Sequence, residues 1–214
     1  MADEPPGSEG LLRRAAVGDV AAWGALLAAH QDRLWRMIAF RMDPRLRGRV
    51  DALDVIQDAF VEASAHRSDY FRPSTGPLFL WLRTIVVNKL LEVHRHHLGT
   101  RMRDAKRDLP LAAPRWQEDT SSALCAHLTA GVTSPSAAAA RDEVRTRLAD
   151  ALARIDPIDR EVLALRHFEQ LSNAEAAQVL GIHEYAAAKR HLRALRRLRE
   201  MLADMPGGLT ELRS

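Results

Sequence analysis

The 214-residue sequence has only one cysteine, Cys125, and no long apolar run. A single cysteine cannot form a disulfide within the chain, which fits a reducing cytoplasm. Apolar runs are short, and the one at residues 78–82 is stopped by Arg83, so no membrane span is expected. The first residues are acidic and proline-containing, with no apolar core of a secretion signal. These absences argue against a disulfide-rich secreted protein and against a membrane protein.

Motifs for catalysis and metal binding are also missing. The sequence has no glycine-rich phosphate loop, no nucleophile elbow and no paired carboxylates in an apolar setting, so we expect neither an enzyme nor a cofactor. His94 and His97 have helical spacing, and Cys125 and His127 follow further on. A zinc site needs a second close pair of ligands on ordered backbone, so we expect no metal site.

What is present is apolar spacing typical of helices. With 47% hydrophobic and 28% charged residues, the chain can form cores and remain in solution. Strand-like alternation is rare, which predicts an all-α fold of two small helical domains joined by a flexible linker. The expected limits are residues 8–100, a linker rich in Pro, Ala, Ser and Thr over 101–136, and residues 137–204. A sequence pI near 9.5 favours an acidic polymer as partner.

Four helices are expected in the first domain, from residues 9 to 17, 20 to 42, 52 onward and 77 to 97. Ser8, Asp19 and Asp51 are placed to cap the first three, and Pro77 suits the first turn of the fourth. Proline, glycine and serine make residues 68–76 an expected loop. The apolar face of the third helix is expected to comprise Leu53, Ile56, Phe60 and Ala63.

The second domain contains a predicted helix-turn-helix. Ser172 and Glu175 form a capping box that starts a helix at Asn173. Gly181 ends that helix, because glycine takes a left-handed turn at little cost, and a second helix starts near Glu184. A further helix is expected before the motif, introduced by Asp156 and Pro157, and another before that with Val144, Leu148, Leu152 and Ile155 on one face.

The last helix carries basic side chains with no acid among them until Glu200. These are Lys189, Arg190, Arg193, Arg196, Arg197 and Arg199. The solvated face of an ordinary bundle is the alternative interpretation. Because the turn chemistry and the charge agree, we expect this helix to bind DNA phosphates and bases.

Three stretches, taken in their order along the chain, resemble one protein family. They are DALDVIQDAFVEA (residues 51–63), FLWLRTIVVNKLLEVHRHH (79–97) and the segment 156–202. Together they resemble the extracytoplasmic-function (ECF) group of bacterial RNA polymerase sigma factors over nearly the whole chain. The segment IDPIDREVLALRHFEQLSNAEAAQVLGI (155–182) is similar to the family's C-terminal promoter-binding segment. Residues 185–188 and His191 depart from the commoner pattern, and these departures concern the preferred DNA sequence and not the fold.

The resemblance implies three sets of contacts. The polymerase clamp helices would be bound by Asp54, Gln57 and Asp58, with Glu62 on the same face. The −10 element would be bound by Tyr70, Phe71, Asn88, Lys89, Glu92, Arg95 and His96. Tyr70 and Phe71 would capture a flipped base, although both rings packing onto the domain is the alternative. The −35 element would be bound by His183, Tyr185, Ala186, Lys189, Arg190, Arg193 and Arg196.

The sequence thus predicts a cytoplasmic sigma factor with core polymerase and promoter DNA as partners. A helix-turn-helix regulator that does not bind polymerase is the alternative, and a helical adaptor without DNA binding is a third class. The promoter sequence, the stimulus and the existence of an anti-sigma factor are left open.

Overall fold

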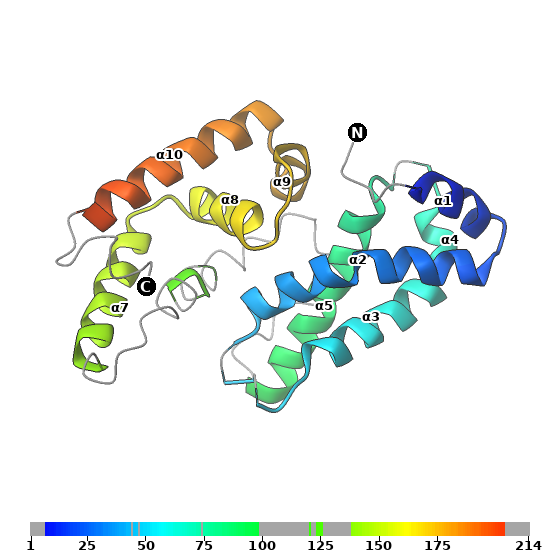
Figure 1. The fold of residues 1–214 in the computed structure, drawn as a ribbon, viewed down its shortest axis with the longest axis horizontal. Helices are drawn as coiled ribbons and strands as arrows, with labels where there is room; N and C mark the ends of the chain where they lie inside the picture. The colour runs from blue at the N-terminus through cyan, green and yellow to red at the C-terminus, as the bar shows by residue number, and fades with distance from the viewer. Residues whose placement is uncertain are drawn as a thin grey trace. The chain divides into compact units, whose positions relative to one another are not determined.

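The computed structural model describes residues 7–43, 45–46, 48–73, 75–98, 120, 123–125 and 138–203. Every regular element within these residues is an α-helix (Figure 1). The chain divides into two compact units, Met1–Leu109 and Pro110–Ser214. The predicted fold class, two small helical domains, is confirmed; most of the expected linker, residues 101–136, lies outside the described residues.

The first unit is built on three helices that pack against one another. Its helices are α1 (Ser8–Ala16), α2 (Val20–Arg41), α3 (Ala52–Ala65), α4 (Arg67–Tyr70) and α5 (Leu78–Leu98). Helices α2, α3 and α5 contact each other, and α1 packs on α2. Their shared core includes Leu26, Leu34, Ile38, Ile56, Phe79, Leu82 and Leu90.

The predicted caps set the starts of α2 and α3. The carboxylates of Asp19 and Asp51 each accept a backbone N–H from the first turn of the helix that follows, at 2.9 and 2.8 Å. The expectation for Ser8 was wrong: Ser8 is the first residue of α1, and Gly7 takes the cap position with φ 95°. A backbone position with positive φ favours glycine, and here Gly7 leads the chain into α1 through a left-handed turn.

Two further expectations for this unit were wrong. Helix α3 buries Val55, Ile56, Ala59 and Ala63, whereas Leu53 is 42% exposed and Phe60 is half-buried. The face predicted from the sequence is therefore rotated from the observed one. The segment expected to be a loop also begins with a helical turn, α4, which ends at Tyr70.

The second unit consists of α7 (Ala138–Ala153), α8 (Pro157–His167), α9 (Asn173–Leu180) and α10 (Glu184–Ala203). Helices α8, α9 and α10 contact one another, and α7 contacts α10. Asp156 caps α8 by accepting the backbone N–H of Ile158 at 2.9 Å, with Pro157 at the first helical position, as predicted. The core residues include Leu148, Leu152, Val162, Leu163, Leu165, Leu171 and Ala176.

Candidate functional site

The turn between α9 and α10 has the geometry that its sequence predicts. Ser172 Oγ accepts the Glu175 backbone N–H at 3.1 Å, and the Glu175 carboxylate accepts the Ser172 backbone N–H at 2.8 Å. Gly181 ends α9 with φ 63°, and the N–H of Ile182 donates to the carbonyl of Ala177 at 3.0 Å. Because Ala177 is buried where the chain turns, the two helices pack closely. The predicted helix-turn-helix is confirmed.

The side chains of α10 fall into three rows along the helix. Ala187 and Ala194 are buried and face the core. A second row points to neighbouring helices and comprises Arg190, Arg193 and Arg197. A third row, called the outer row here, is exposed to solvent and comprises Tyr185, Lys189, Leu192, Arg196 and Arg199. Its spacing of four, three, four and three residues keeps it on one face.

The outer row begins at the N-terminal end of α10, the end that meets base edges in helix-turn-helix proteins. Tyr185 is 65% exposed, and Lys189 Nζ lies 4.7 Å from the centre of its ring. His183 Nδ1 accepts the Tyr185 backbone N–H at 3.3 Å, which holds the imidazole beside the helix start. Ala186 is half-buried next to them. An aromatic ring, an ammonium group and an imidazole are thus presented together to solvent.

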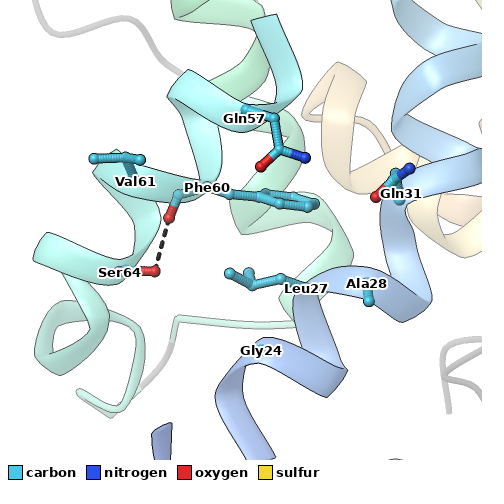
Figure 2. Close-up of a pocket in the computed structure, with 8 residues that line it drawn as sticks. All are labelled: Gly24, Leu27, Ala28, Gln31, Gln57, Phe60, Val61 and Ser64. Carbon is cyan, nitrogen blue, oxygen red and sulfur yellow. Dashed lines mark hydrogen bonds between the residues drawn. The ribbon is translucent and has the colours of Figure 1, made fainter. Parts of the chain in front are cut away.

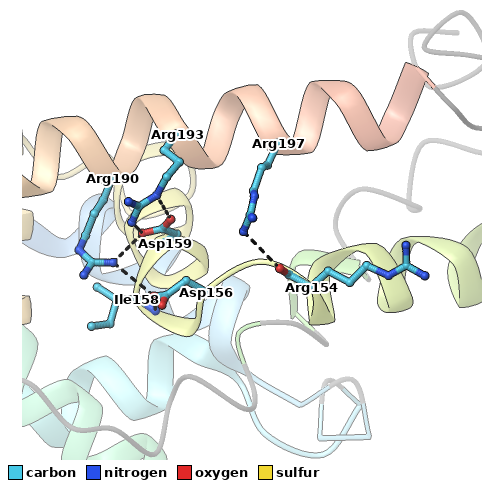
Figure 3. Close-up of polar contacts among 7 residues, drawn as sticks. All are labelled: Arg154, Asp156, Ile158, Asp159, Arg190, Arg193 and Arg197. Atoms are coloured by element: carbon cyan, nitrogen blue, oxygen red, sulfur yellow. Dashed lines mark hydrogen bonds and ion pairs between the residues drawn. The ribbon is translucent and has the colours of Figure 1, made fainter.

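A buried carboxylate engages two arginines of the second row, Arg190 and Arg193 (Figure 3). The side chain of Asp159 on α8 is 0% exposed. Arg193 donates to it through Nε at 2.7 Å and through its terminal nitrogen at 2.8 Å, and Arg190 donates at 2.8 Å. Arg190 also reaches Asp156 at 3.3 Å. Two arginines expected on DNA therefore have a partner within their own unit.

In this cluster, Asp159 and Arg193 stabilise one another in their charged forms. Burial by itself raises the pKa of Asp159, but hydrogen bonds from Arg193 and Arg190 outweigh it, so the pKa lies below the ordinary 3.8. The hydrogen bonding between Arg193 and Asp159 in turn raises the pKa of Arg193. The position of Asp159 in the first turn of α8 also places its negative charge at the positive end of the helix dipole. Asp159 is thus held as a carboxylate.

The sequence of the last helix does not indicate Asp159, because the acid that pairs with its arginines lies on α8. A signal was present, since Val162 and Leu163 follow at three and four residues, which places Asp159 on the core-facing side of α8. A carboxylate at such a position needs a cationic partner.

Two histidines also join α8 to α10. The Nε2 atoms of His167 and His191 lie 2.9 Å apart. Burial lowers the pKa of both rings, and the positive charge of Arg166 adds to that effect. At this distance one nitrogen must accept a hydrogen bond from the other, so the arrangement excludes two protonated rings.

On α3, the polar face predicted to bind a protein is present. Asp54, Gln57 and Asp58 are exposed, while Glu62 is half-buried and forms an ion pair with Lys89 of α5 at 2.7 Å. The side chains free to meet a partner are therefore the first three, and Glu62 has a role within the unit.

A shallow groove runs beside this polar face, between α2 and α3 (Figure 2). Its volume is about 480 Å³, and its lining residues are Gly24, Leu27, Ala28, Gln31, Gln57, Phe60, Val61 and Ser64. The floor is apolar, and Gln57 and Gln31 stand at its edges (Figure 2). Gln57 belongs to both features, so the groove and the acidic residues form one continuous surface.

The polar side of α5 is less open than its sequence suggests. Asn88 is half-buried, and Lys89 is shared between Glu62 at 2.7 Å and Glu92 at 3.3 Å. These hydrogen bonds raise the pKa of Lys89, so its positive charge is balanced within the unit. His96 is exposed, and Arg95 is half-buried and donates to the carbonyl of Leu91 at 3.3 Å.

The expectation that Tyr70 lies in a loop was wrong, because Tyr70 is the last residue of α4. Its side chain is buried, with ring centres 6.2 Å from Trp23, 5.4 Å from Trp81 and 5.1 Å from Phe71. Phe71 is half-buried, 6.1 Å from Trp23. Trp23 is fixed in turn by a hydrogen bond from its Nε1 to Ser64 at 3.1 Å. Both rings thus belong to an aromatic cluster that joins α2, α4 and α5.

The histidines near the end of α5 do not form a ligand set. His94 is buried, and its Nε2 accepts the Asp43 backbone N–H at 3.4 Å. Within the described residues, no group of three His, Cys, Asp or Glu side chains is placed to hold a metal ion. Cys125 is buried, and His127 lies outside the described residues. In the same part of the chain, no helix has the length and apolarity needed to cross a bilayer.

Several known proteins resemble this chain in sequence. The family model for sigma-70, region 4, matches residues 145–198, which include α8, α9 and most of α10. The RNA polymerase sigma factor CnrH of Cupriavidus metallidurans is 31% identical over 197 residues, covering 90% of this chain and 92% of CnrH. The ECF RNA polymerase sigma factor BldN of Streptomyces coelicolor is 28% identical over 194 residues, covering 91% of this chain and 65% of BldN.

The fold agrees with the sequence relationship. A solved structure of CnrH in complex with the cytosolic domain of CnrY matches this chain with a TM-score of 0.51 and 28% identity, and covers 92% of this chain and 99% of the solved one. Sequence relatives along almost the whole chain, the region 4 match and the helix-turn-helix lead to one conclusion. The chain belongs to the ECF group of RNA polymerase sigma factors, the subunits that act with RNA polymerase core and promoter DNA in transcription initiation.

Proposed function

We propose that the predicted second domain, residues 137–204, binds the −35 promoter element through the N-terminal half of α10. The observation that carries this proposal is the exposed outer row, which lies on the second helix of the helix-turn-helix and begins with Tyr185 and Lys189. His183, Ala186 and Arg196 complete the proposed contact surface. Arg190 and Arg193 flank that surface, and their guanidinium groups bond to Asp159.

The test measures binding of the full chain to a duplex selected by the unmodified chain from a random library. Lys189→Ala removes one phosphate or base contact, so we expect about tenfold weaker binding, equivalent to about 1.4 kcal/mol. Arg13→Ala is the matched control, because Arg13 is an exposed cation on α1 of the other unit. If Lys189→Ala and Tyr185→Ala both bind like the control variant, α10 is not the reading element.

We further propose that the predicted first domain, residues 8–100, binds the clamp helices of the polymerase through α3. Asp54, Gln57 and Asp58 supply polar and negative groups for a basic partner, and the neighbouring groove offers an apolar contact. Glu62 contributes by fixing Lys89 behind this face.

Replacing Asp54 and Asp58 with Arg should abolish capture of core polymerase, because the face would then repel a basic surface. The helix should survive, since both positions are exposed. Glu9→Arg with Asp150→Arg introduces the same change in net charge on other exposed positions and should leave capture intact. Equal capture by the two double variants in a pull-down would refute the assignment to α3.

The −10 element is assigned to α5 and the segment before it. Asn88, Glu92, Arg95 and His96 lie along the polar side of α5, and Lys89 is held among them by Glu62 and Glu92. Tyr70 and Phe71 support this side from the aromatic cluster. A base captured during opening would meet this polar side, which can hydrogen-bond to base edges.

The protein acts by binding alone, with no catalytic step of its own. Its place of action is the cytoplasm, where polymerase and chromosome are found. Its likeness to CnrH, solved in complex with the cytosolic domain of CnrY, supports a further protein partner of the anti-sigma kind.

A further inference from the structure

The arginines of α10 are divided between two environments, and one residue on another helix decides the division. Arg190 and Arg193 lie three residues apart, and both donate to the carboxylate of Asp159 at 2.7 to 2.8 Å. Lys189 and Arg196 lie on the outer row and have no contact with that carboxylate. The basic charge of α10 is thus not presented as one continuous surface.

The contact with Asp159 is strong enough to hold both side chains. Arg193 engages both carboxylate oxygens, a bidentate geometry that fixes the guanidinium plane. Asp159 is completely buried and cannot turn to solvent, so the arginines must come to it. Leaving Asp159 for a DNA phosphate would strand a buried carboxylate, which is costly.

Phosphate contacts add affinity without regard to sequence, whereas base contacts provide discrimination. We infer that Asp159 is a specificity-determining residue: by withholding Arg190 and Arg193 from DNA phosphates, it reduces sequence-independent binding and leaves recognition to the outer row. This inference depends on the proposed role of α10 in DNA binding. It assigns to an acidic residue of α8, which need not touch DNA, control over how selectively α10 binds.

The test uses the full chain with Asp159→Asn, which keeps the shape of the side chain and removes its charge. Two probes are compared over a range of salt concentrations: a mixed-sequence 20-base-pair duplex, and the duplex selected by the unmodified chain. Each freed arginine that reaches a phosphate adds about 0.9 to the salt slope, so the slope on the mixed duplex should steepen by about 1 to 2. Preference for the selected duplex should fall at the same time.

Asp156→Asn is the matched control. It makes the same change in net charge three residues away and keeps a side chain suited to the cap of α8. It removes only a 3.3 Å contact of Arg190, which keeps Asp159 as partner at 2.8 Å. Its salt slope should match that of the unmodified chain.

A second variant keeps the inference testable if Asp159→Asn fails to fold. In Asp159→Asn, Arg190→Gln, Arg193→Gln all three groups are neutral and can still hydrogen-bond to one another. If the two arginines are withheld from DNA in the unmodified chain, this triple variant binds both duplexes with the original slope. A slope shallower by about 2 in the triple variant would show that both arginines already contact DNA, and would overturn the inference.

Loss of the −35 assignment itself would have a different result. The unmodified chain would then show no preference for any selected duplex, and Lys189→Ala would have no effect. An Asp159→Asn protein that folds, with unchanged slope and unchanged preference, would instead refute only the role of Asp159.

Discussion

Replacing Arg193 with Ala should destabilise the helix-turn-helix unit, because Arg193 supplies two of the three hydrogen bonds that Arg190 and Arg193 donate to the buried Asp159. Breaking a fully buried ion pair by removing one partner costs about 3–5 kcal/mol. Here Arg190 remains at 2.8 Å, and the side chain of Arg193 is 47% exposed, so part of that cost is screened. We therefore expect a loss of about 2 kcal/mol in the free energy of opening α8 and α10.

The full chain has two units, so a single unfolding midpoint would mix their stabilities. Hydrogen exchange followed by mass spectrometry avoids this, because peptides from α8 and α10 report local opening. A loss of about 2 kcal/mol corresponds to exchange about 30-fold faster. Peptides from α2 and α5 of the other unit should exchange as before.

Arg196→Ala is the matched control on the same helix. Arg196 is 73% exposed, and its ion pair within the described residues is a 3.9 Å contact with Glu200. Its removal should therefore change the opening free energy of the unit by less than about 0.5 kcal/mol. The two variants should therefore separate stability from DNA contact, since Arg196→Ala is expected to weaken DNA binding in a stable unit. Equal exchange rates in the two variants would refute the argument that Asp159 needs Arg193.

Three further predictions concern other parts of the chain. Tyr70→Ala should lower the stability of the first unit by about 3 kcal/mol, because the ring is buried in the aromatic cluster. Normal protein stability would instead establish base capture, if the variant is impaired in opening duplex promoter DNA but not on templates already mismatched at −10. Because burial lowers the pKa of His167 and His191 in the folded state, the unfolded chain gains protons first, and α8 and α10 should lose stability as pH falls below 6.5; exchange measured between pH 7 and 5.5 should show this, and His191→Gln should weaken the dependence. Gly181→Ala should destabilise α9 by about 1 kcal/mol through its φ of 63° alone, since an added Cβ meets no atom within 4 Å; an unchanged exchange rate in α9 would contradict this.

The start of a helix could be predicted from the sequence where a nearby side chain caps it. Asp19, Asp51, Asp156 and Ser172 each accept a backbone N–H within three residues, so the information is local. The same holds for Gly181, whose left-handed φ follows from residue type. The helix-turn-helix could thus be derived in detail, because both of its determinants lie within ten residues of each other.

Predictions were wrong where several surfaces compete for one residue. Apolar residues cover a wide arc of α3, and periodicity alone does not locate the centre of that arc, so Leu53 was placed in the core although it is 42% exposed. Tyr70 presents the same difficulty, since its neighbours Trp23 and Trp81 come from α2 and α5. Only the packing of three helices shows that its ring is buried.

Charge on α10 was also interpreted too locally. A run of arginines without acids on its own helix predicts that all of them are available to DNA, yet Arg190 and Arg193 are paired with an aspartate 31 and 34 residues earlier in the chain. Asp159 occupies a core-facing position on α8, and burial of a carboxylate there requires cations from a neighbouring helix. In a helix-turn-helix the neighbouring helix is the recognition helix. An acid on the core side of α8 therefore predicts that part of the basic charge of α10 is engaged within the protein. Only the cations of the outer row should then be counted as phosphate contacts when the salt dependence of DNA binding is predicted.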